Sequence, residues 1–275
     1  MSYELIEKNL KYALMLSDLK NKLKTENRYF TVSPILEDIK GYSARATQTI
    51  NEGEVLWRAR KWKSTTSNTD LWISLFENDM SESLLKTHYR SKPEELIGPF
   101  WGYKNDDSFI PKNNNQVNDA RANPKYITYL YVAEEIETSI AEIRPRPCSL
   151  VNIAQISVKE NLKIYDLARW ELCDDDNYQN LIRSLSYAFS TPVNGELEDY
   201  LVSQYLSEFI KSLDFDGVRY WSSMMGYKKN SYLGKGKCVT IFNPDKCKVI
   251  GSQIHRINEI NIDSNCVVPN KENTR

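Results

Sequence analysis

The sequence predicts an α+β fold in which small mixed sheets are flanked by helices. Segments rich in β-branched and aromatic residues recur along the chain, and amphipathic helical segments separate only some of them. This irregular order is unlike the strict strand–helix alternation of a doubly wound parallel sheet. With 41% hydrophobic and 27% charged residues in 275, the composition is that of an ordinary globular protein.

Three helices are predicted from apolar periodicity. Residues 4–24 repeat apolar side chains at close to 3.6-residue spacing, with lysines on the opposite side. Residues 134–143 form a second apolar face that ends before Pro145, and residues 197–213 form a third.

Strands are predicted where β-branched and aromatic residues cluster between turn signals. Prolines and a run of asparagines make residues 64–118 a loop-rich stretch with at most one or two helices. One predicted strand begins at residue 54. The others span 126–133, 150–158, 162–167, 218–222 and 238–242.

Charge and residue usage exclude several classes of protein. The 36 Lys+Arg and 37 Asp+Glu give a net charge of −1, so no global field attracts nucleic acid, and we expect no nucleic-acid partner. No apolar run approaches the ~20 residues of a membrane span, and no secretory signal pattern opens the chain. Five cysteines without a CxxC pair favour reduced thiols. We therefore expect a cytoplasmic protein without a membrane partner.

A metal site is not expected either. The chain has two histidines, His88 and His255, which are far apart in the sequence. This scarcity disfavours a His-rich zinc site and leaves few candidates for a His-based triad.

Three segments carry residues that could do chemistry. Residues 57–63 combine four cations with two indoles, which suits either a solvated strand end or an anion site built from Arg58 or Arg60. Arg121, a strand with Tyr131 and a helix with Glu142 follow in an order that can surround one cleft. Alternatively, Glu142 forms a surface ion pair of little energetic value.

The third segment, residues 213–223, ends in the hydroxyl pair Ser222-Ser223. Such a pair either caps a turn or donates to an amide or phosphate. The absence of a Gly-x-Ser-x-Gly elbow around it disfavours a serine hydrolase.

Together these segments resemble the RES domain family over roughly residues 54–245. The matching motifs are Leu-Trp-Arg58-Ala-Arg60, Ala-Arg121-Ala-Asn-Pro, Leu-Tyr131-Val-Ala, Thr-Ser-Ile-Ala-Glu142, Asp-Gly-Val-Arg-Tyr-Trp-Ser222 and Ile-Phe-Asn243-Pro. Two features depart from the family pattern: Ala120 replaces a glycine, and the interval from Arg58 to Arg121 is long. We divide the chain into an N-terminal helical extension (1–45), a RES-like catalytic domain (46–257, with 64–118 as an insertion) and a polar tail (258–275).

The resemblance implies a fold similar to that of ADP-ribosyltransferases and an activity that consumes NAD. Members of the family are bacterial toxins that split nicotinamide from NAD, with water or phosphate as the acceptor of the remaining ADP-ribosyl group, usually beside an antitoxin protein. NAD is then a substrate, with no prosthetic group and no metal. The alternatives are an ADP-ribosyltransferase acting on a macromolecule and a non-catalytic nucleotide-binding module.

The family also implies roles for individual residues. Glu142 would hold the ribose hydroxyls and stabilise positive charge at the reacting carbon, while Arg58 and Arg121 would fix the pyrophosphate or the acceptor phosphate. Tyr131 would stack on nicotinamide, and Ser222 would hydrogen-bond its amide or a phosphate.

Two further residues have weaker assignments. Arg60 is the second possible register for the first arginine, and Asn243 is a candidate for the cleft wall.

Overall fold

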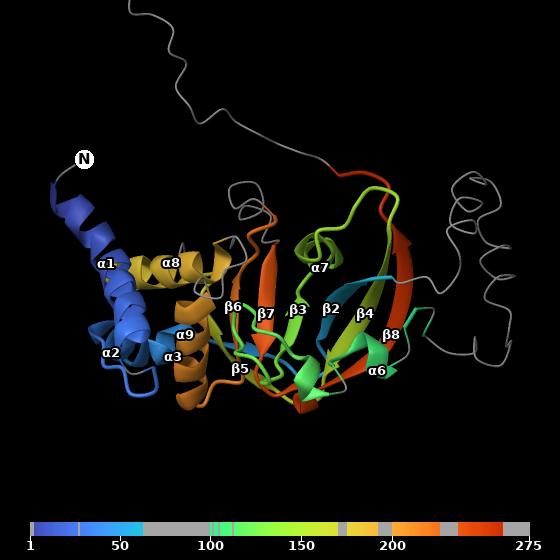
Figure 1. Cartoon of the computed structure of the whole chain (residues 1–275), viewed down its shortest axis with the longest axis horizontal. Coiled ribbons are helices and arrows are strands. Elements are labelled where there is room, and N and C mark those ends of the chain that lie inside the picture. Colours follow the sequence, from blue (N-terminus) through green and yellow to red (C-terminus); the bar gives the residue numbers. More distant parts are fainter. Residues whose placement is uncertain are drawn as a thin grey trace, which may run out of the picture.

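The computed structural model describes residues 3–26, 28–62, 100, 102–103, 105–111, 113–169, 175–191, 200–225 and 236–260. Its strands form one eight-stranded mixed sheet in the order β1-β5-β6-β7-β3-β2-β4-β8 (Figure 1). The α+β class is confirmed, whereas the prediction of several small sheets is wrong. The sheet is continuous because β7 pairs with both β6 and β3, and β2 pairs with both β3 and β4.

All strand pairs are antiparallel except β5 with β6. The weakest junction is between β2 and β3, which share the single paired position Trp57–Ala133. The strands are β1 (Thr47–Ile50), β2 (Val55–Lys61), β3 (Leu130–Ala133), β4 (Leu150–Val158), β5 (Leu162–Asp166), β6 (Gly217–Trp221), β7 (Lys237–Ile241) and β8 (Cys247–Arg256).

The helices lie in two groups. Figure 1 shows α1, α2, α3, α8 and α9 gathered beside the β5–β6 end of the sheet, and α7 beside β3 and β2. The bounds are α1 (Tyr3–Thr25), α2 (Pro34–Gly41), α3 (Ser43–Ala46), α6 (Asn105–Ser108), α7 (Ile136–Glu142), α8 (Asp176–Ser190) and α9 (Leu201–Ser212), with short 3₁₀ turns η2 (Asn114–Gln116) and η5 (Pro244–Lys246). None of the helices among the described residues is long and apolar enough to span a bilayer.

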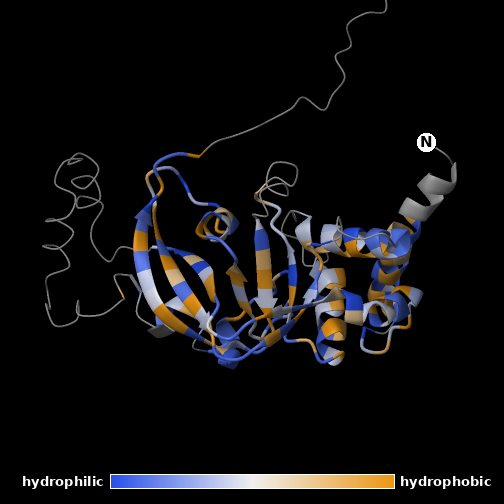
Figure 2. Ribbon diagram, turned by 180° about the vertical axis from the view of Figure 1, so that it is seen from behind, coloured by the Kyte–Doolittle hydropathy of each residue, from blue (hydrophilic) through white to orange (hydrophobic). Residues whose placement is uncertain are grey.

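Apolar side chains pack on both faces of the sheet. One cluster joins Tyr12, Leu19 and Leu23 of α1 to α8, α9 and the buried Tyr165 of β5, so the predicted N-terminal extension shares a core with the sheet. A second cluster on the other face holds apolar residues of every strand except β6, together with Phe109. Figure 2 shows apolar residues alternating with polar ones along several strands, which is typical of strands with one face less buried than the other.

Several elements differ from the sequence-based predictions. The predicted strand 126–133 begins only at Leu130, because Tyr126 adopts a φ of 73° that a strand does not accommodate. The strand β8 and the helix α8 were not predicted. Most of the loop-rich stretch 64–118, and the tail from residue 261, lie outside the described residues.

Replacing Gly217 by alanine should destabilise the sheet, because a Cβ there would lie 2.3 Å from the Thr240 carbonyl oxygen and 3.1 Å from Ile164 Cδ1. We expect a loss of about 1–3 kcal/mol in the free energy of unfolding, measured by urea denaturation. Gly41→Ala is the matched control, since nothing lies within 4 Å of a Cβ at that position. Equal stability of the two variants would contradict this packing.

Candidate active site

The carboxylate of Glu142 and the hydroxyl of Ser222 meet at one edge of the sheet. Glu142 ends α7, and Ser222 follows the last residue of β6. Ser222 Oγ donates a hydrogen bond to Glu142 Oε1 at 2.5 Å and accepts one from the Met224 backbone N–H at 3.1 Å. Ser222 is buried, whereas Glu142 is exposed. The contact therefore holds a carboxylate in a defined position that solutes can reach.

The packing of α7 explains how Glu142 reaches this edge. Ile136, Ile140 and Ile143 of the helix segment contact the face of β2 that presents Trp57. These isoleucines fix the rotation of α7. The Ser222 hydrogen bond then ties its last residue to the end of β6.

A buried thiol and a buried phenol lie near Glu142. Cys238 of β7 pairs with Ala133 of β3 on one side and with Tyr220 of β6 on the other. Burial raises the pKa of Cys238 well above its usual value, and the charge of Glu142 raises it further. Burial likewise raises the pKa of Tyr220, with a contribution from Glu142. Both groups are neutral at physiological pH.

Tyr131 of β3 is anchored through its hydroxyl. The hydroxyl donates to Asn123 Oδ1 at 2.6 Å and accepts from the Ala122 N–H at 3.0 Å. Burial raises the pKa of this phenol, and the positive charges of Arg121 and Arg58 oppose part of the rise. The ring is thus a fixed, neutral surface within the electrostatic range of both arginines.

The loop carrying Arg121 is held by α9. Ser203 Oγ donates to the Arg121 carbonyl at 2.6 Å, and Gln204 Nε2 donates to two carbonyls of the loop 119–124, each at 3.0 Å. The guanidinium donates through Nη1 to the Thr191 carbonyl at 3.0 Å. The backbone of Arg121 is therefore fixed on one side while most of its guanidinium N–H groups remain available.

Ala120, which replaces the family's glycine, needs no special backbone conformation. The non-glycine residues with positive φ in the described part of the chain are Tyr126, Arg144, Cys148 and Asp214. Since Ala120 is not among them, the departure from the family pattern imposes no left-handed strain on this turn.

The structure separates the roles of Arg58 and Arg60. Arg58 Nη1 donates to the Tyr131 carbonyl at 2.7 Å, and its buried Nε has no hydrogen-bond partner. Arg60 donates to the carbonyls of Asp107 and Phe109, at 2.5 and 3.1 Å. Arg60 therefore fixes the segment around residues 107–109, and Arg58 is the arginine that reaches β3.

Arg58 nevertheless lies behind the Glu142 cluster. Strand alternation directs Arg58 to the face of β2 opposite Trp57, and Trp57 is the residue that contacts the α7 layer. Burial lowers the pKa of Arg58 to about 9, with a further contribution from the charge of Arg60. The side chain is therefore a cation at neutral pH. It contacts the backbone of Tyr131 from the opposite face of the sheet.

Asn243 lies apart from these residues. Cys238 is the second residue of β7, and Asn243 lies two residues beyond the other end of this strand, about 16 Å away at strand spacing. The Asn243 side chain accepts from the Asp245 N–H at 3.0 Å and so caps η5. The structure gives Asn243 a local capping role.

The arginines differ in how their charge is balanced. Arg219 donates to Asp166 Oδ1 at 3.0 Å and to Glu134 Oε1 at 2.8 Å, and it makes a second, shorter contact with Asp166. In contrast, none of the ion pairs among the described residues includes Arg58 or Arg121. Arg58 and Arg121, the two cations near Tyr131, therefore have no carboxylate partner in the part of the chain that the structure describes.

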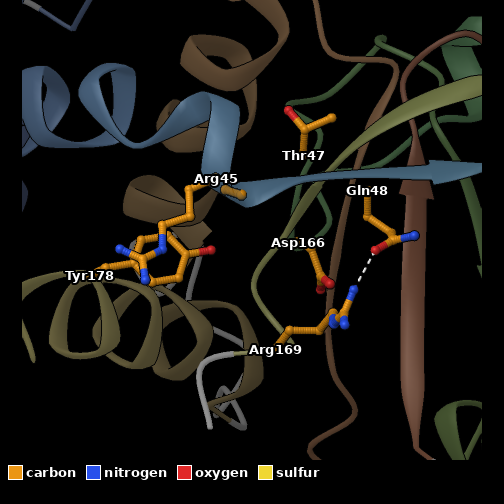
Figure 3. A pocket seen from close by; sticks show the side chains of 7 residues that line it. Arg45, Thr47, Gln48, Asp166, Arg169 and Tyr178 are labelled. Carbon is orange, nitrogen blue, oxygen red and sulfur yellow. Dashed lines mark hydrogen bonds between the residues drawn. The ribbon is translucent and has the colours of Figure 1, made fainter. Parts of the chain in front are cut away.

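A cavity of about 220 Å³ opens elsewhere, beside β1 and β5 (Figure 3). Its charged groups bind one another or their neighbours: Arg45 pairs with Asp175 at 3.1 Å, and Arg169 donates to Gln48 at 2.6 Å. The lining residues are Arg45, Ala46, Thr47, Gln48, Asp166, Arg169 and Tyr178. None of the sequence-predicted site residues lines this cavity.

Sequence reasoning missed the residues that support the site. Nothing in the sequence marked Cys238 as a neighbour of Glu142, or Ser203 and Gln204 of α9 as anchors for the Arg121 loop. Those contacts span more than 80 residues, so no local pattern could indicate them. No group of three His, Cys, Asp or Glu side chains that could hold a metal ion occurs within the described ranges.

The sheet and the residues at its edge define an α+β protein with an exposed carboxylate, Glu142, that is held by the Ser222 hydroxyl. A family model of the RES domain matches residues 89–257, more than half of the chain. The protein belongs to the RES domain family. The match includes Arg121, Tyr131, Glu142, Ser222 and Asn243, but it begins after Arg58 and Arg60 and extends beyond the expected limit at residue 245.

A solved structure with a related outline is the M. tuberculosis MbcT-MbcA toxin-antitoxin complex. A chain of it aligns with a TM-score of 0.38 and 9% identity, over 80% of this chain and 91% of that one. No curated protein sequence matches. Family membership rests on the RES domain model.

Replacing Tyr131 by phenylalanine should destabilise the protein, because Asn123 Oδ1 and the Ala122 N–H would lose their partner. We expect a loss of about 1–3 kcal/mol in the free energy of unfolding. Tyr126→Phe is the control, since that ring is 52% exposed. If urea denaturation gave the same stability for both variants, the anchoring role of the Tyr131 hydroxyl would be wrong.

Proposed function

We propose that this protein is an NAD-consuming enzyme of the toxin type that breaks the bond between nicotinamide and ribose. The observation that carries the proposal is the exposed Glu142 carboxylate, oriented by Ser222 and located in a RES domain. Membership of this family implies the substrate and a relation to the ADP-ribosyltransferase fold.

A carboxylate without a strong nucleophile suits this reaction. When the C–N bond breaks, nicotinamide leaves as a neutral molecule with the bonding electron pair, and positive charge develops on the ribose ring. Glu142 would stabilise that charge and accept hydrogen bonds from the ribose hydroxyls. Water or phosphate then forms the new bond to the anomeric carbon, and an attacking water releases its proton to solvent. No general acid is needed for the leaving group.

The arginines would bind the negatively charged part of the substrate. Arg121 offers free guanidinium N–H groups beside Tyr131, and a guanidinium can grip a phosphate through two parallel hydrogen bonds. Arg58 adds positive charge from behind β3. A bound pyrophosphate would offset the cost of leaving both cations without acidic partners.

Tyr131 and Ser222 would complete the site in different ways. The fixed Tyr131 ring is suited to stack on nicotinamide. The Ser222 hydroxyl already donates a hydrogen bond to Glu142. We therefore propose that Ser222 orients this carboxylate rather than binding the amide of nicotinamide. We further propose an antitoxin protein as partner, because family members are usually encoded beside one that blocks the cleft.

Glu142→Gln should reduce nicotinamide release from NAD by more than about 100-fold, because the variant retains the shape but loses the negative charge. Nicotinamide is followed by chromatography, with and without phosphate. Glu137→Gln, on the exposed side of the same helix, is the matched control. Equal rates for the two variants would remove Glu142 from the mechanism.

The products of the same reaction identify the acceptor. ADP-ribose indicates water, a phosphorylated ADP-ribose formed only with phosphate indicates phosphorolysis, and label retained on protein indicates an ADP-ribosyltransferase. Folded protein that releases no nicotinamide and retains no label would contradict the proposed function.

Arg121→Gln should raise KM for NAD about tenfold or more with a smaller change in kcat, because a charge-assisted hydrogen bond to phosphate contributes about 1.5–3 kcal/mol. Lys125→Gln, an exposed cation on the neighbouring turn, should leave KM unchanged. An unchanged KM in Arg121→Gln would place the phosphate site elsewhere.

A further inference from the structure

Gln204 of α9 contacts the backbone of the loop that carries Arg121. Its side-chain Nε2 donates to the carbonyls of Ala120 and Asn123, each at 3.0 Å. The same nitrogen lies 3.4 Å from Asp119 Oδ1, which is a further acceptor. Because an amide nitrogen carries two hydrogens, one side chain can serve both carbonyls. A single residue of α9 is therefore bonded to the loop on either side of Arg121.

We infer that Gln204 is a positioning residue, which fastens the loop 119–124 to α9 and thereby holds Arg121 and Tyr131 in one fixed arrangement. The inference rests on the proposed roles of Arg121 and Tyr131 in binding NAD. It assigns to Gln204 an effect on that binding, and this effect acts through the loop rather than through a contact with the substrate.

Asn123 connects Gln204 to Tyr131. The backbone carbonyl of Asn123 accepts from Gln204, while its side-chain Oδ1 accepts from the Tyr131 hydroxyl at 2.6 Å. The N–H of Ala122, the residue between Arg121 and Asn123, donates to the same hydroxyl at 3.0 Å. A displacement of the loop would therefore move Arg121 and both partners of the Tyr131 hydroxyl together.

Bonds within the loop maintain its shape, whereas bonds to α9 fix its location. The Ala120 N–H donates to the Asn123 carbonyl at 3.0 Å, and this bond can persist when the loop moves as a unit. From α9, Ser203 Oγ donates to the Arg121 carbonyl at 2.6 Å. Without the bonds from Gln204, the loop is free to pivot about the Ser203 contact.

The helix that carries Gln204 is itself held by the N-terminal region. Leu206 and Ile210 of α9 are fully buried in the cluster that includes α1 and α8. The Tyr205 hydroxyl donates to the Thr31 carbonyl, between α1 and α2, at 2.9 Å. This region precedes residue 89, where the RES match begins. Through α9 and Gln204, the N-terminal helices therefore support the loop of Arg121.

Backbone amide hydrogen exchange of the full chain, followed by NMR, tests the fastening without substrate. Gln204→Met removes both hydrogen bonds at a similar side-chain length, so the N–H groups of Ala120 and Ala122 should exchange about tenfold faster. The N–H of Val239 in β7, a strand paired on both sides, should keep its rate. Unchanged exchange at Ala120 and Ala122 would overturn the inference.

Two further variants separate a local fastening from a general loss of stability. Ser212→Ala is the matched control on α9, because this exposed hydroxyl donates to the Phe209 carbonyl of its own helix at 2.6 Å. It should leave the loop amides unchanged. Gln204→Glu also removes the donor at neutral pH, and it replaces Gln204→Met if that variant does not fold. Equal acceleration at Val239 and in the loop would contradict a local role.

Kinetics test the consequence for NAD binding. Gln204→Met should raise KM for NAD about tenfold with kcat within about threefold of normal, because it displaces side chains that bind substrate. In the Arg121→Gln background, the same change should raise KM less than about threefold, since part of its effect acts through Arg121. A KM in Gln204→Met within about twofold of normal would overturn the inference.

This inference and the proposed function fail in distinguishable ways. Absence of nicotinamide release by the unmodified protein contradicts the proposed function, while hydrogen exchange still decides whether Gln204 fastens the loop. Normal release, with loop exchange and KM unaffected by Gln204→Met, contradicts only the role of Gln204.

Discussion

The pairing of β7 with β3 on one side and β6 on the other is the constraint on which the site depends. It places Tyr131, Cys238 and the end of β6 on three adjacent strands, although the chain between them is about 100 residues long. Gly217 makes part of this pairing possible, because a side chain there would collide with the Thr240 carbonyl oxygen. The carboxylate of Glu142 then needs only one short helix to reach the same edge.

The buried and half-buried arginines of the sheet region differ in the groups that they bind. Arg219 binds Asp166 of β5 and Glu134 at the β3–α7 junction, so its charge is balanced within the fold. Arg58 and Arg121 are fixed through backbone carbonyls instead, at Tyr131 and Thr191. A carbonyl orients a guanidinium without neutralising it. In the proposed function, these two cations supply the positive potential that attracts the phosphates of the substrate.

Local patterns predicted most elements but not how they assemble. The strand 150–158 was predicted with its observed bounds because its composition is that of a fully buried strand. Arg121, Tyr131 and Glu142 lie close together in the sequence, within local motifs. Their order could therefore both suggest one cleft and indicate the family. The single continuous sheet, the separate roles of Arg58 and Arg60, and the contacts of Gln204 with the Arg121 loop depend on pairings between distant segments. No sequence window contains both partners of those contacts, so sequence alone could not reveal them.

In the proposed function, Glu142 must be accessible to substrate, yet its orientation must not vary. Exposure alone would allow the carboxylate to sample several rotamers, and burial alone would exclude the ribose. The structure combines both features: Ser222, which donates to the carboxylate, is buried, and the carboxylate that accepts is at the surface. Such preorganisation lets the negative charge stabilise the developing cation without first reorienting.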